Sequence, residues 1–264
     1  MEVIILPSAT AVARTAAGLV ARAVRANPAT VLGLPTGETP KPIYAELVRL
    51  HREEGLDLAR VTTFNLDEYV GIDETHPASY RRYMQERLFG HVNLRADHAH
   101  VPDGRAPDVE SACAAYEAAI RAAGGIDLQL LGVGADGHIG FNEPSSSLGS
   151  RTRMKTLLAE TLAALRARLP PGEEPPRHVL TMGIGTILEA RRCLVVATGR
   201  RKAAAVARMV EGPLTALVPA SALQLHPRTT VLVDEEAAER LALAPYYRDV
   251  QANKPAWQRE RDGA

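Results

Sequence analysis

The sequence predicts an α/β fold in three layers, with a mostly parallel sheet between two layers of helices. Apolar runs of four to seven residues alternate with longer helical patterns along most of the chain. Most of these runs are continuously apolar, which is typical of strands that are buried on both faces. Glycines and polar residues cluster directly after three of the runs, where the loops of such sheets form binding sites.

The elements are expected in the following order. The predicted strands are 3–6, 31–34, 61–65, 127–133, 178–184, 193–198 and 229–234. An alanine-rich helix follows the first strand to about Ala26, and a second helix covers Lys41 to Glu53. A short helix over about Glu160 to Arg168 must end before the proline-rich loop 169–177, because proline cannot continue a helix. Without a repeat or a linker, 1–264 is predicted to be one domain with a polar tail at about 248–264.

Charge and cysteine content exclude several classes of protein. Lys and Arg together number 31, as do Asp and Glu, so the bulk charge favours neither nucleic acid nor an acidic membrane. Cys113 and Cys193 form no disulfide framework and are expected to be buried and reduced. The first apolar run is too short for a signal peptide, and no run is long enough to span a membrane. A cytoplasmic protein is therefore expected.

The segment PTGETP (35–40) joins a predicted strand to a predicted helix. Its amides and threonine hydroxyls are placed where a phosphate could bind. It has neither the P-loop nor the dinucleotide spacing of glycines. The alternative is an ordinary turn in which Thr39 caps the helix and Pro40 is its first residue. The segment alone does not distinguish these two interpretations.

Two adjacent carboxylates, Asp67 and Glu68, follow the predicted strand 61–65. At the edge of a sheet, Asp67 could act as a proton-transferring base. The alternative, which the segment alone favours, is a solvated turn or a helix start.

The segment GVGADGHIGFNE (132–143) is the strongest signal of chemistry. Its four glycines allow a close approach to a ligand and surround Asp136, His138 and Glu143. A carboxylate near His138 would fix its tautomer and raise its pKa, as a proton shuttle requires. His98 and His100 have strand spacing but no third ligand nearby, so no metal site is expected. No G-x-S-x-G elbow of a serine hydrolase is present.

Taken together, these segments resemble the glucosamine-6-phosphate deaminase family from about Val3 to Leu243. The resemblance rests on LGLPTGETP, on TFNLDEYVG followed by HPASY, and on GVGADGHIGFNEP, SSLGSRTRMKTL and LQLHP. It implies a three-layer fold similar to ribose-5-phosphate isomerases and CoA transferases. It also implies conversion of glucosamine 6-phosphate to fructose 6-phosphate and ammonia, without a metal or other cofactor.

The resemblance also implies roles for individual residues. Asp67 matches the base that moves a proton between C2 and C1. His138 matches the residue that assists ring opening, and Asp136 and Glu143 match the carboxylates that hold it. The implied ligands of the substrate phosphate are Thr36, Gly37, Thr39, Lys202 and Arg166.

An effector site is implied as well. Ser146, Arg153 and Lys155 match a site between subunits of a hexamer that binds N-acetylglucosamine 6-phosphate. From the residues alone, this segment would be interpreted as a solvated basic strand. The expected partners are thus an amino-sugar phosphate, this effector and further copies of the chain.

The sequence departs from the family pattern at two places. Glu38 stands where the family has Gly or Ser, and it is expected to point away from the phosphate. The lid, about 151–178, lacks the usual aromatic pair after its arginine, with Arg166 as the best match and Arg168 beside it. These departures leave open a galactosamine-6-phosphate deaminase, a related lactonase or a silent sugar-phosphate sensor.

Overall fold

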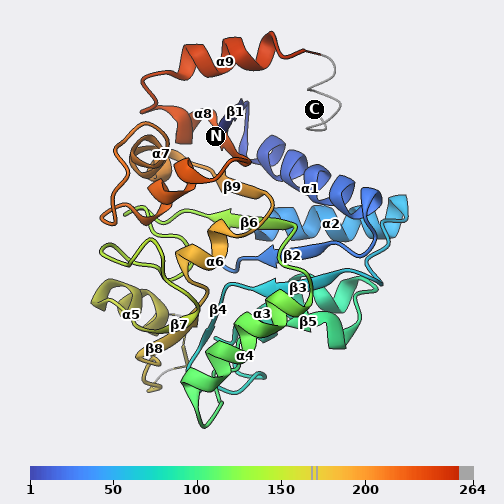
Figure 1. Cartoon of the computed structure of the whole chain (residues 1–264), viewed down its shortest axis with the longest axis vertical. Coiled ribbons are helices and arrows are strands. Elements are labelled where there is room, and N and C mark those ends of the chain that lie inside the picture. The colour runs from blue at the N-terminus through green and yellow to red at the C-terminus, as the bar shows by residue number, and fades with distance from the viewer. Residues whose placement is uncertain (168, 171, 256–264) are drawn as a thin grey trace.

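The computed structural model describes residues 1–167, 169–170 and 172–255. Its centre is a parallel sheet of seven strands in the order β1-β10-β9-β6-β2-β3-β5, with helices on both sides (Figure 1). The strands are β1 (Glu2–Leu6), β2 (Val31–Leu34), β3 (Thr62–Asn65), β5 (Ala99–His100), β6 (Leu128–Gly132), β9 (Cys193–Ala197) and β10 (Thr229–Asp234). The predicted α/β fold with a mostly parallel sheet is confirmed.

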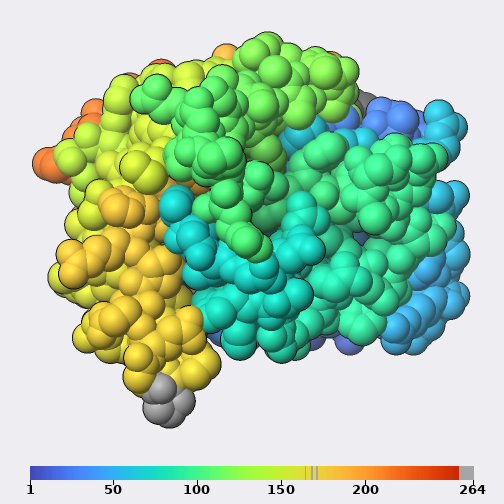
Figure 2. All heavy atoms as spheres, turned by 90° about the horizontal axis from the view of Figure 1, so that it is seen from below, coloured from blue at the N-terminus to red at the C-terminus, as the bar shows by residue number. Residues whose placement is uncertain are grey.

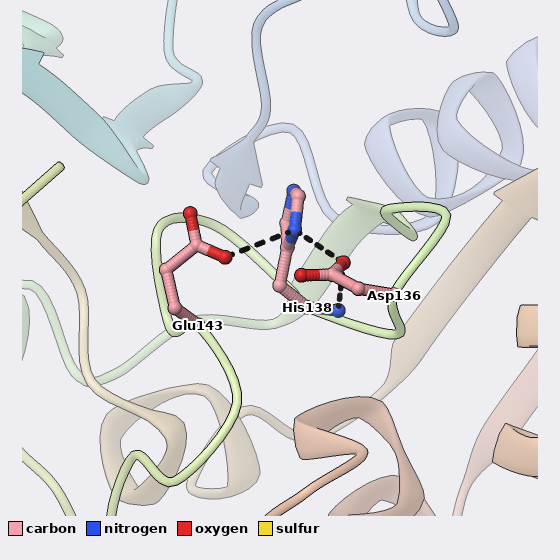
Figure 3. Close-up of side chains that lie close together, drawn as sticks. All are labelled: Asp136, His138 and Glu143. Atoms are coloured by element: carbon pink, nitrogen blue, oxygen red, sulfur yellow. Dashed lines mark hydrogen bonds and ion pairs between the residues drawn. The ribbon is translucent and has the colours of Figure 1, made fainter. Parts of the chain in front are cut away.

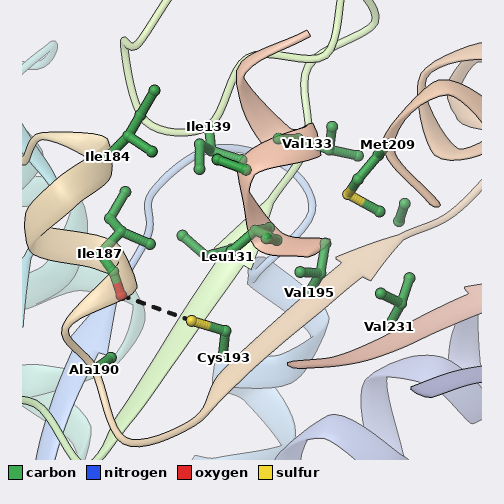
Figure 4. Packing of buried hydrophobic residues seen from close by; sticks show 14 of the residues in the cluster. Leu131, Val133, Ile139, Ile184, Ile187, Ala190, Cys193, Val195, Met209 and Val231 are labelled. Atoms are coloured by element: carbon green, nitrogen blue, oxygen red, sulfur yellow. Dashed lines mark hydrogen bonds between the residues drawn. The ribbon is translucent and has the colours of Figure 1, made fainter. Parts of the chain in front are cut away.

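Alternate residues of the same strands form two apolar cores, one on each face of the sheet. Leu32, Leu130 and Leu194 point to the face covered by α1 (Ala9–Ala26), α2 (Lys41–Glu54) and α3 (Tyr80–Arg87). Leu131 and Val195 point to the other face (Figure 4). That face packs against α4 (Val109–Ala122), α6 (Ile184–Leu188), α7 (Ala203–Val210) and α8 (Glu235–Ala238). Burial on both faces explains why the strand runs are continuously apolar.

A second, antiparallel sheet corrects the prediction for 178–184. This segment was expected to join the parallel sheet, but β8 (His178–Thr181) lies between β4 (Asp67–Tyr69) and β7 (Arg153–Thr156). A buried central strand of either sheet has the same apolar pattern, so the sequence could not distinguish them. Figure 2 shows the segment around β7 and β8, in yellow, as a lobe beside the cyan segment that follows β4.

The end of one predicted helix and the start of the predicted polar tail also differ from the structure. Helix α5 is Ala159–Arg166, and Arg168, predicted to be in this helix, lies outside the described residues. Helix α9 (Ala244–Ala252) includes the first residues of the predicted polar tail, and 256–264 lie outside the description.

Both cysteines are buried and unpaired, as predicted. None of the helices within the described ranges is long and apolar enough to cross a membrane.

Candidate active site

A pocket of about 400 Å³ lies beyond the carboxyl ends of β2, β3, β6 and β9. Four chain segments that are distant in the sequence meet there. Its lining residues are Pro35, Thr36, Gly37, Glu38, Thr39, Leu66, Asp67, Tyr80, Gly132, Val133, Gly134, Ala135, His138, Gly140, Phe141 and Lys202. All three segments singled out in the sequence therefore contribute to one pocket.

Asp67 is a buried carboxylate at the start of β4, only 5% exposed. The chain leaves the central sheet after Asn65 and enters the small sheet at Asp67, so the side chain lies where the two sheets meet. The suggestion of a solvated turn or helix start at Asp67 and Glu68 is therefore wrong. Burial raises the pKa of Asp67 to about 7, although hydrogen bonds from the Thr181 hydroxyl and the Phe141 amide oppose the rise. Such a carboxylate can both take and return a proton near neutral pH.

His138 faces two carboxylates from its own loop (Figure 3). Its Nδ1 lies 2.7 Å from Asp136 Oδ1 and 3.5 Å from Glu143 Oε2, while the other ring nitrogen points away from both. The Asp136 oxygen is poorly aligned for a hydrogen bond to Nδ1, so the contact is mainly electrostatic. Burial lowers the pKa of His138, but the contact and charge of Asp136 and the charge of Glu143 outweigh it, and the net pKa is raised.

The two carboxylates are in different surroundings. Contact with His138 holds the pKa of Asp136 well below its usual range, although partial burial opposes this. Burial raises the pKa of Glu143, which is 5% exposed. Two carboxylates with opposed shifts beside one histidine are typical of a site that moves protons.

The loop needs glycine at specific positions. Gly137 has φ +97°, and a Cβ there would also lie 2.7 Å from Val218 Cγ1. Gly134 has ordinary φ, but a Cβ on it would lie 2.3 Å from His138 Nδ1. The glycine at 134 therefore allows the imidazole to lie against the backbone.

Gly134→Ala is expected to lower kcat by about a hundredfold, because the imidazole must shift by roughly an ångström. Gly18→Ala in α1 is the matched control, since no atom lies within 4 Å of its added Cβ. Steady-state kinetics and thermal unfolding of both variants test this. Unchanged kcat in a folded Gly134→Ala protein would contradict the assigned packing.

The segment 35–40 forms one wall of the pocket. Thr36, Gly37 and Thr39 line it, and Gly37 has φ +103°, which favours glycine. Helix α2 is capped at Pro40 without a side-chain hydrogen bond, so the alternative in which Thr39 is the cap is wrong. Glu38 lies at the rim: its side chain is 68% exposed and both oxygens contact Lys41 Nζ, at 2.7 and 2.8 Å. This agrees with the expected outward orientation.

Lys202 supplies the cation of the pocket. It ends a single 3₁₀ turn, Arg200–Lys202, that follows β9. Burial lowers its pKa, and the charge of Asp136 opposes this. A lysine beside backbone amides and threonine hydroxyls suits a phosphate group.

Arg166 is not brought into the pocket. At the end of α5 its side chain is 61% exposed, and it pairs with Glu174 at 2.5 Å. Arg168 lies outside the described residues.

Two of the three residues of the expected effector site contact the loop that follows His138: the Ser146 amide donates to the Glu143 carbonyl and Arg153 donates to the Asn142 side chain. Arg153 and Lys155 are on one face of β7, and Arg153 donates to Asn142 Oδ1. Ser146 is 3% exposed, and its hydroxyl has no hydrogen-bond partner within the described ranges.

Three groups in or beside the pocket were not assigned a role from the sequence. Tyr80 lines the pocket, and its hydroxyl contacts that of Tyr69 at 3.0 Å. Phe141 and Thr181 supply the amide and the hydroxyl near Asp67. The motif HPASY contained Tyr80, but Thr181 had no signal, because it ends β8, a strand of a sheet that was not predicted.

Among the described residues, His98 and His100 are not in the group of side chains that could hold a metal. His98 contacts the Val61 carbonyl, and His100 stacks on Phe64. In the described part of the chain, the group suited to a metal is Asp136, His138 and Glu143, whose ligand atoms all lie within 4.8 Å of one another.

Fold and pocket define a class: an α/β enzyme that performs acid–base chemistry on a small anionic substrate at the carboxyl edge of its sheet. The family described as glucosamine-6-phosphate isomerases/6-phosphogluconolactonase matches residues 7–232. The chain belongs to this family.

Individual relatives and solved structures also match the chain over most of its length. The glucosamine-6-phosphate deaminase of Arthrobacter sp. (strain FB24) is 52% identical over 98% of this chain and 99% of its own. That of Streptomyces coelicolor is 50% identical over the same shares. A solved monomeric glucosamine-6-phosphate deaminase is 42% identical, with a TM-score of 0.88 over 91% of this chain and 100% of its own. The 6-phosphogluconolactonase of Trypanosoma cruzi, 21% identical with a TM-score of 0.71 over 91% and 97%, shares the fold.

Proposed function

We propose that the protein is an enzyme that converts glucosamine 6-phosphate and water to fructose 6-phosphate and ammonia. The observation that carries this function is the placement of a buried carboxylate with a pKa of about 7 in the same pocket as a carboxylate-flanked histidine and a lysine. These are the groups that ring opening and isomerisation of a phosphorylated amino sugar require. We propose no metal or cofactor for this reaction, because each step is a proton transfer or the addition or loss of water or ammonia.

Asp67 is the base in this proposal. Its carboxylate removes the proton from C2 of the open sugar and returns it to C1, giving the 2-imino ketose precursor. Water then adds at C2 and ammonia leaves, which yields fructose 6-phosphate. A pKa of about 7 suits this task, since a carboxylate with an ordinary pKa of about 3.9 would be a much weaker base.

His138 acts before Asp67. The ring nitrogen that points away from the carboxylates accepts the proton of the anomeric hydroxyl and delivers it to the ring oxygen. Asp136 and Glu143 orient the imidazole and stabilise its charged form.

The substrate phosphate is proposed to bind Thr36, Gly37, Thr39 and Lys202. Arg166 completes this set only if α5 moves toward the pocket, because its guanidinium pairs with Glu174 in this structure. The lobe that carries α5 is therefore proposed to act as a lid.

Lys202→Met is expected to raise KM by about ten- to a hundredfold while changing kcat little, because a charged hydrogen bond to the phosphate is lost. Arg201→Met is the matched control, since Arg201 is exposed and does not line the pocket. Equal effects of the two substitutions on KM would contradict the assignment.

A substrate panel tests the function. Purified protein is given glucosamine 6-phosphate, galactosamine 6-phosphate and 6-phosphogluconolactone, and kcat/KM is measured for each. The proposal requires the largest value for glucosamine 6-phosphate. A larger value for either competitor would assign the sibling activity, and binding without turnover of any would indicate a sensor.

We further propose an effector site at Ser146, Arg153 and Lys155 for N-acetylglucosamine 6-phosphate. The unpartnered Ser146 hydroxyl and the two cations on one face of β7 support it. The Ser146 amide donates to the Glu143 carbonyl at 3.0 Å, which links this segment to the catalytic loop. An effector that reorders Ser146 would therefore act on the residue that holds His138.

The same proposal includes a homo-oligomer, with a hexamer as the expected size, in the cytoplasm where sugar phosphates are formed. The solved relative with 42% identity is described as monomeric, so a monomer is the competing outcome. Light scattering with and without N-acetylglucosamine 6-phosphate measures the mass. A monomer whose kinetics do not respond to the effector would contradict this part of the proposal.

A further inference from the structure

The Asp136–His138–Glu143 cluster has the geometry of a cation site as well as that of a proton shuttle. Each residue presents one ligand atom, and all three atoms lie within 4.8 Å of one another. A tetrahedral Zn²⁺ with bonds of about 2.1 Å places its ligand atoms roughly 3.4 Å apart. The two separations from His138 Nδ1, 2.7 Å to Asp136 and 3.5 Å to Glu143, are each within about an ångström of this value.

His138 Nδ1 is the atom that points to a ligand. It is shielded from solvent, yet no described residue gives it a well-aligned hydrogen bond. Figure 3 shows it between the two carboxylates, so a cation bound there would contact all three side chains at once. Two carboxylates and a neutral imidazole also carry the charge that balances a divalent cation.

The cluster also has access and an open coordination position. His138 lines the pocket, and the Asp136 side chain is 39% exposed. A cation can therefore enter from the pocket and keep a water molecule or a substrate oxygen as its fourth ligand. Three protein ligands and one open position are typical of zinc sites that bind water or substrate.

We propose that this cluster binds Zn²⁺ or a similar first-row divalent cation, which displaces the proton of His138 Nδ1 and inhibits the enzyme. The cation takes the Nδ1 lone pair and leaves the neutral ring with its proton on Nε2. That nitrogen then has no lone pair to accept the proton of the anomeric hydroxyl. The inhibition rests on the proposed function, whereas the binding does not.

The positive charge of Lys202 near the cluster allows a further test of cation binding. Its charge lies close enough to act on both Asp136 and His138, so it repels a cation at this cluster. Lys202→Met should therefore bind Zn²⁺ more tightly than the unaltered protein, even though it binds the sugar phosphate more weakly.

Calorimetry with Zn²⁺ alone and visible absorption with Co²⁺ measure binding without using activity. We expect one Zn²⁺ per cluster and the absorption bands of four-coordinate Co²⁺. His138→Gln and Glu143→Gln should each raise the Kd by more than the 10- to 100-fold that is typical of losing an outer-shell partner. His98→Gln is the control and should not change this Kd, because the His98 ring contacts the Val61 carbonyl and is not part of the cluster.

The outcomes separate this inference from the proposed function. An unchanged Kd in folded His138→Gln, or no binding by the unaltered protein, would overturn the site. Glu143→Gln decides the matter if His138→Gln does not fold. Binding that depends on both residues supports the site even if the substrate panel fails. Ammonia release that Zn²⁺ does not inhibit, despite such binding, would overturn the inhibition alone.

Discussion

Asp67→Asn is expected to lower kcat by about 10³-fold or more while leaving the affinity for glucosamine 6-phosphate nearly unchanged. An amide has the shape of the carboxylate but cannot take the C2 proton, and a positioned base contributes about 10²- to 10⁴-fold. Steady-state kinetics with direct measurement of substrate binding separates the two quantities. Activity within tenfold of the unaltered protein would contradict the assignment of the base.

The same substitution is expected to stabilise the fold at alkaline pH. The native pKa of Asp67 is about 7, above the roughly 3.9 of the unfolded chain, so the folded protein holds this proton more tightly. Stability is therefore lost as pH rises from about 4 to 7, and the loss stays constant above that range. Removal of the charge should restore up to about 4 kcal/mol of unfolding free energy at pH 8 and almost nothing at pH 4. Denaturant unfolding at both pH values measures this difference.

His138→Gln is expected to lower kcat by about 10²-fold or more, because the sugar ring must then open without a positioned proton carrier. Proton transfer at C1 and C2 should survive better, since Asp67 is intact. Hydrogen exchange at C1 of fructose 6-phosphate in deuterated water should therefore be less impaired in His138→Gln than in Asp67→Asn. The reverse ranking would contradict the division of roles.

The pH dependence of stability gives a second measurement on His138. Its folded pKa is raised, so its charged form stabilises the fold most at pH below about 6.5, and this is lost as pH rises through the folded value. His138→Gln should cost more unfolding free energy at pH 6 than at pH 9. Equal costs at the two pH values would indicate that the carboxylate contacts do not stabilise the imidazolium.

The parallel sheet was predictable because its strands are buried on both faces, as β2 (Val31–Leu34) and β9 (Cys193–Ala197) are. The small sheet was not, because β4 has only three residues and β8 has the same apolar pattern as a strand of the parallel sheet. The residues of the site were likewise predictable where a local motif marks them and not where they depend on the small sheet. Local motifs located Asp67 and His138, whereas Thr181 beside Asp67 depends on a pairing between β4 and β8.

The burial of Asp67 could not be derived from its own segment either, which suggested a solvated turn. The carboxylate is buried because segments 132–143 and 178–184 pack over it, and its raised pKa follows from that burial. Arg166 shows that a match in sequence position does not determine which residues a side chain contacts. Its sequence position matches a phosphate ligand, but its contact in the fold is with Glu174.

The central claim is that one buried carboxylate isomerises the amino sugar before ammonia leaves, and glucosamine 6-phosphate deuterated at C2 tests it most directly. The account predicts equal amounts of ammonia and fructose 6-phosphate, with deuterium found at C1 or in the water. Ammonia accompanied by an aldose 6-phosphate that retains deuterium at C2 would contradict it, because that product requires direct displacement of the amine by water.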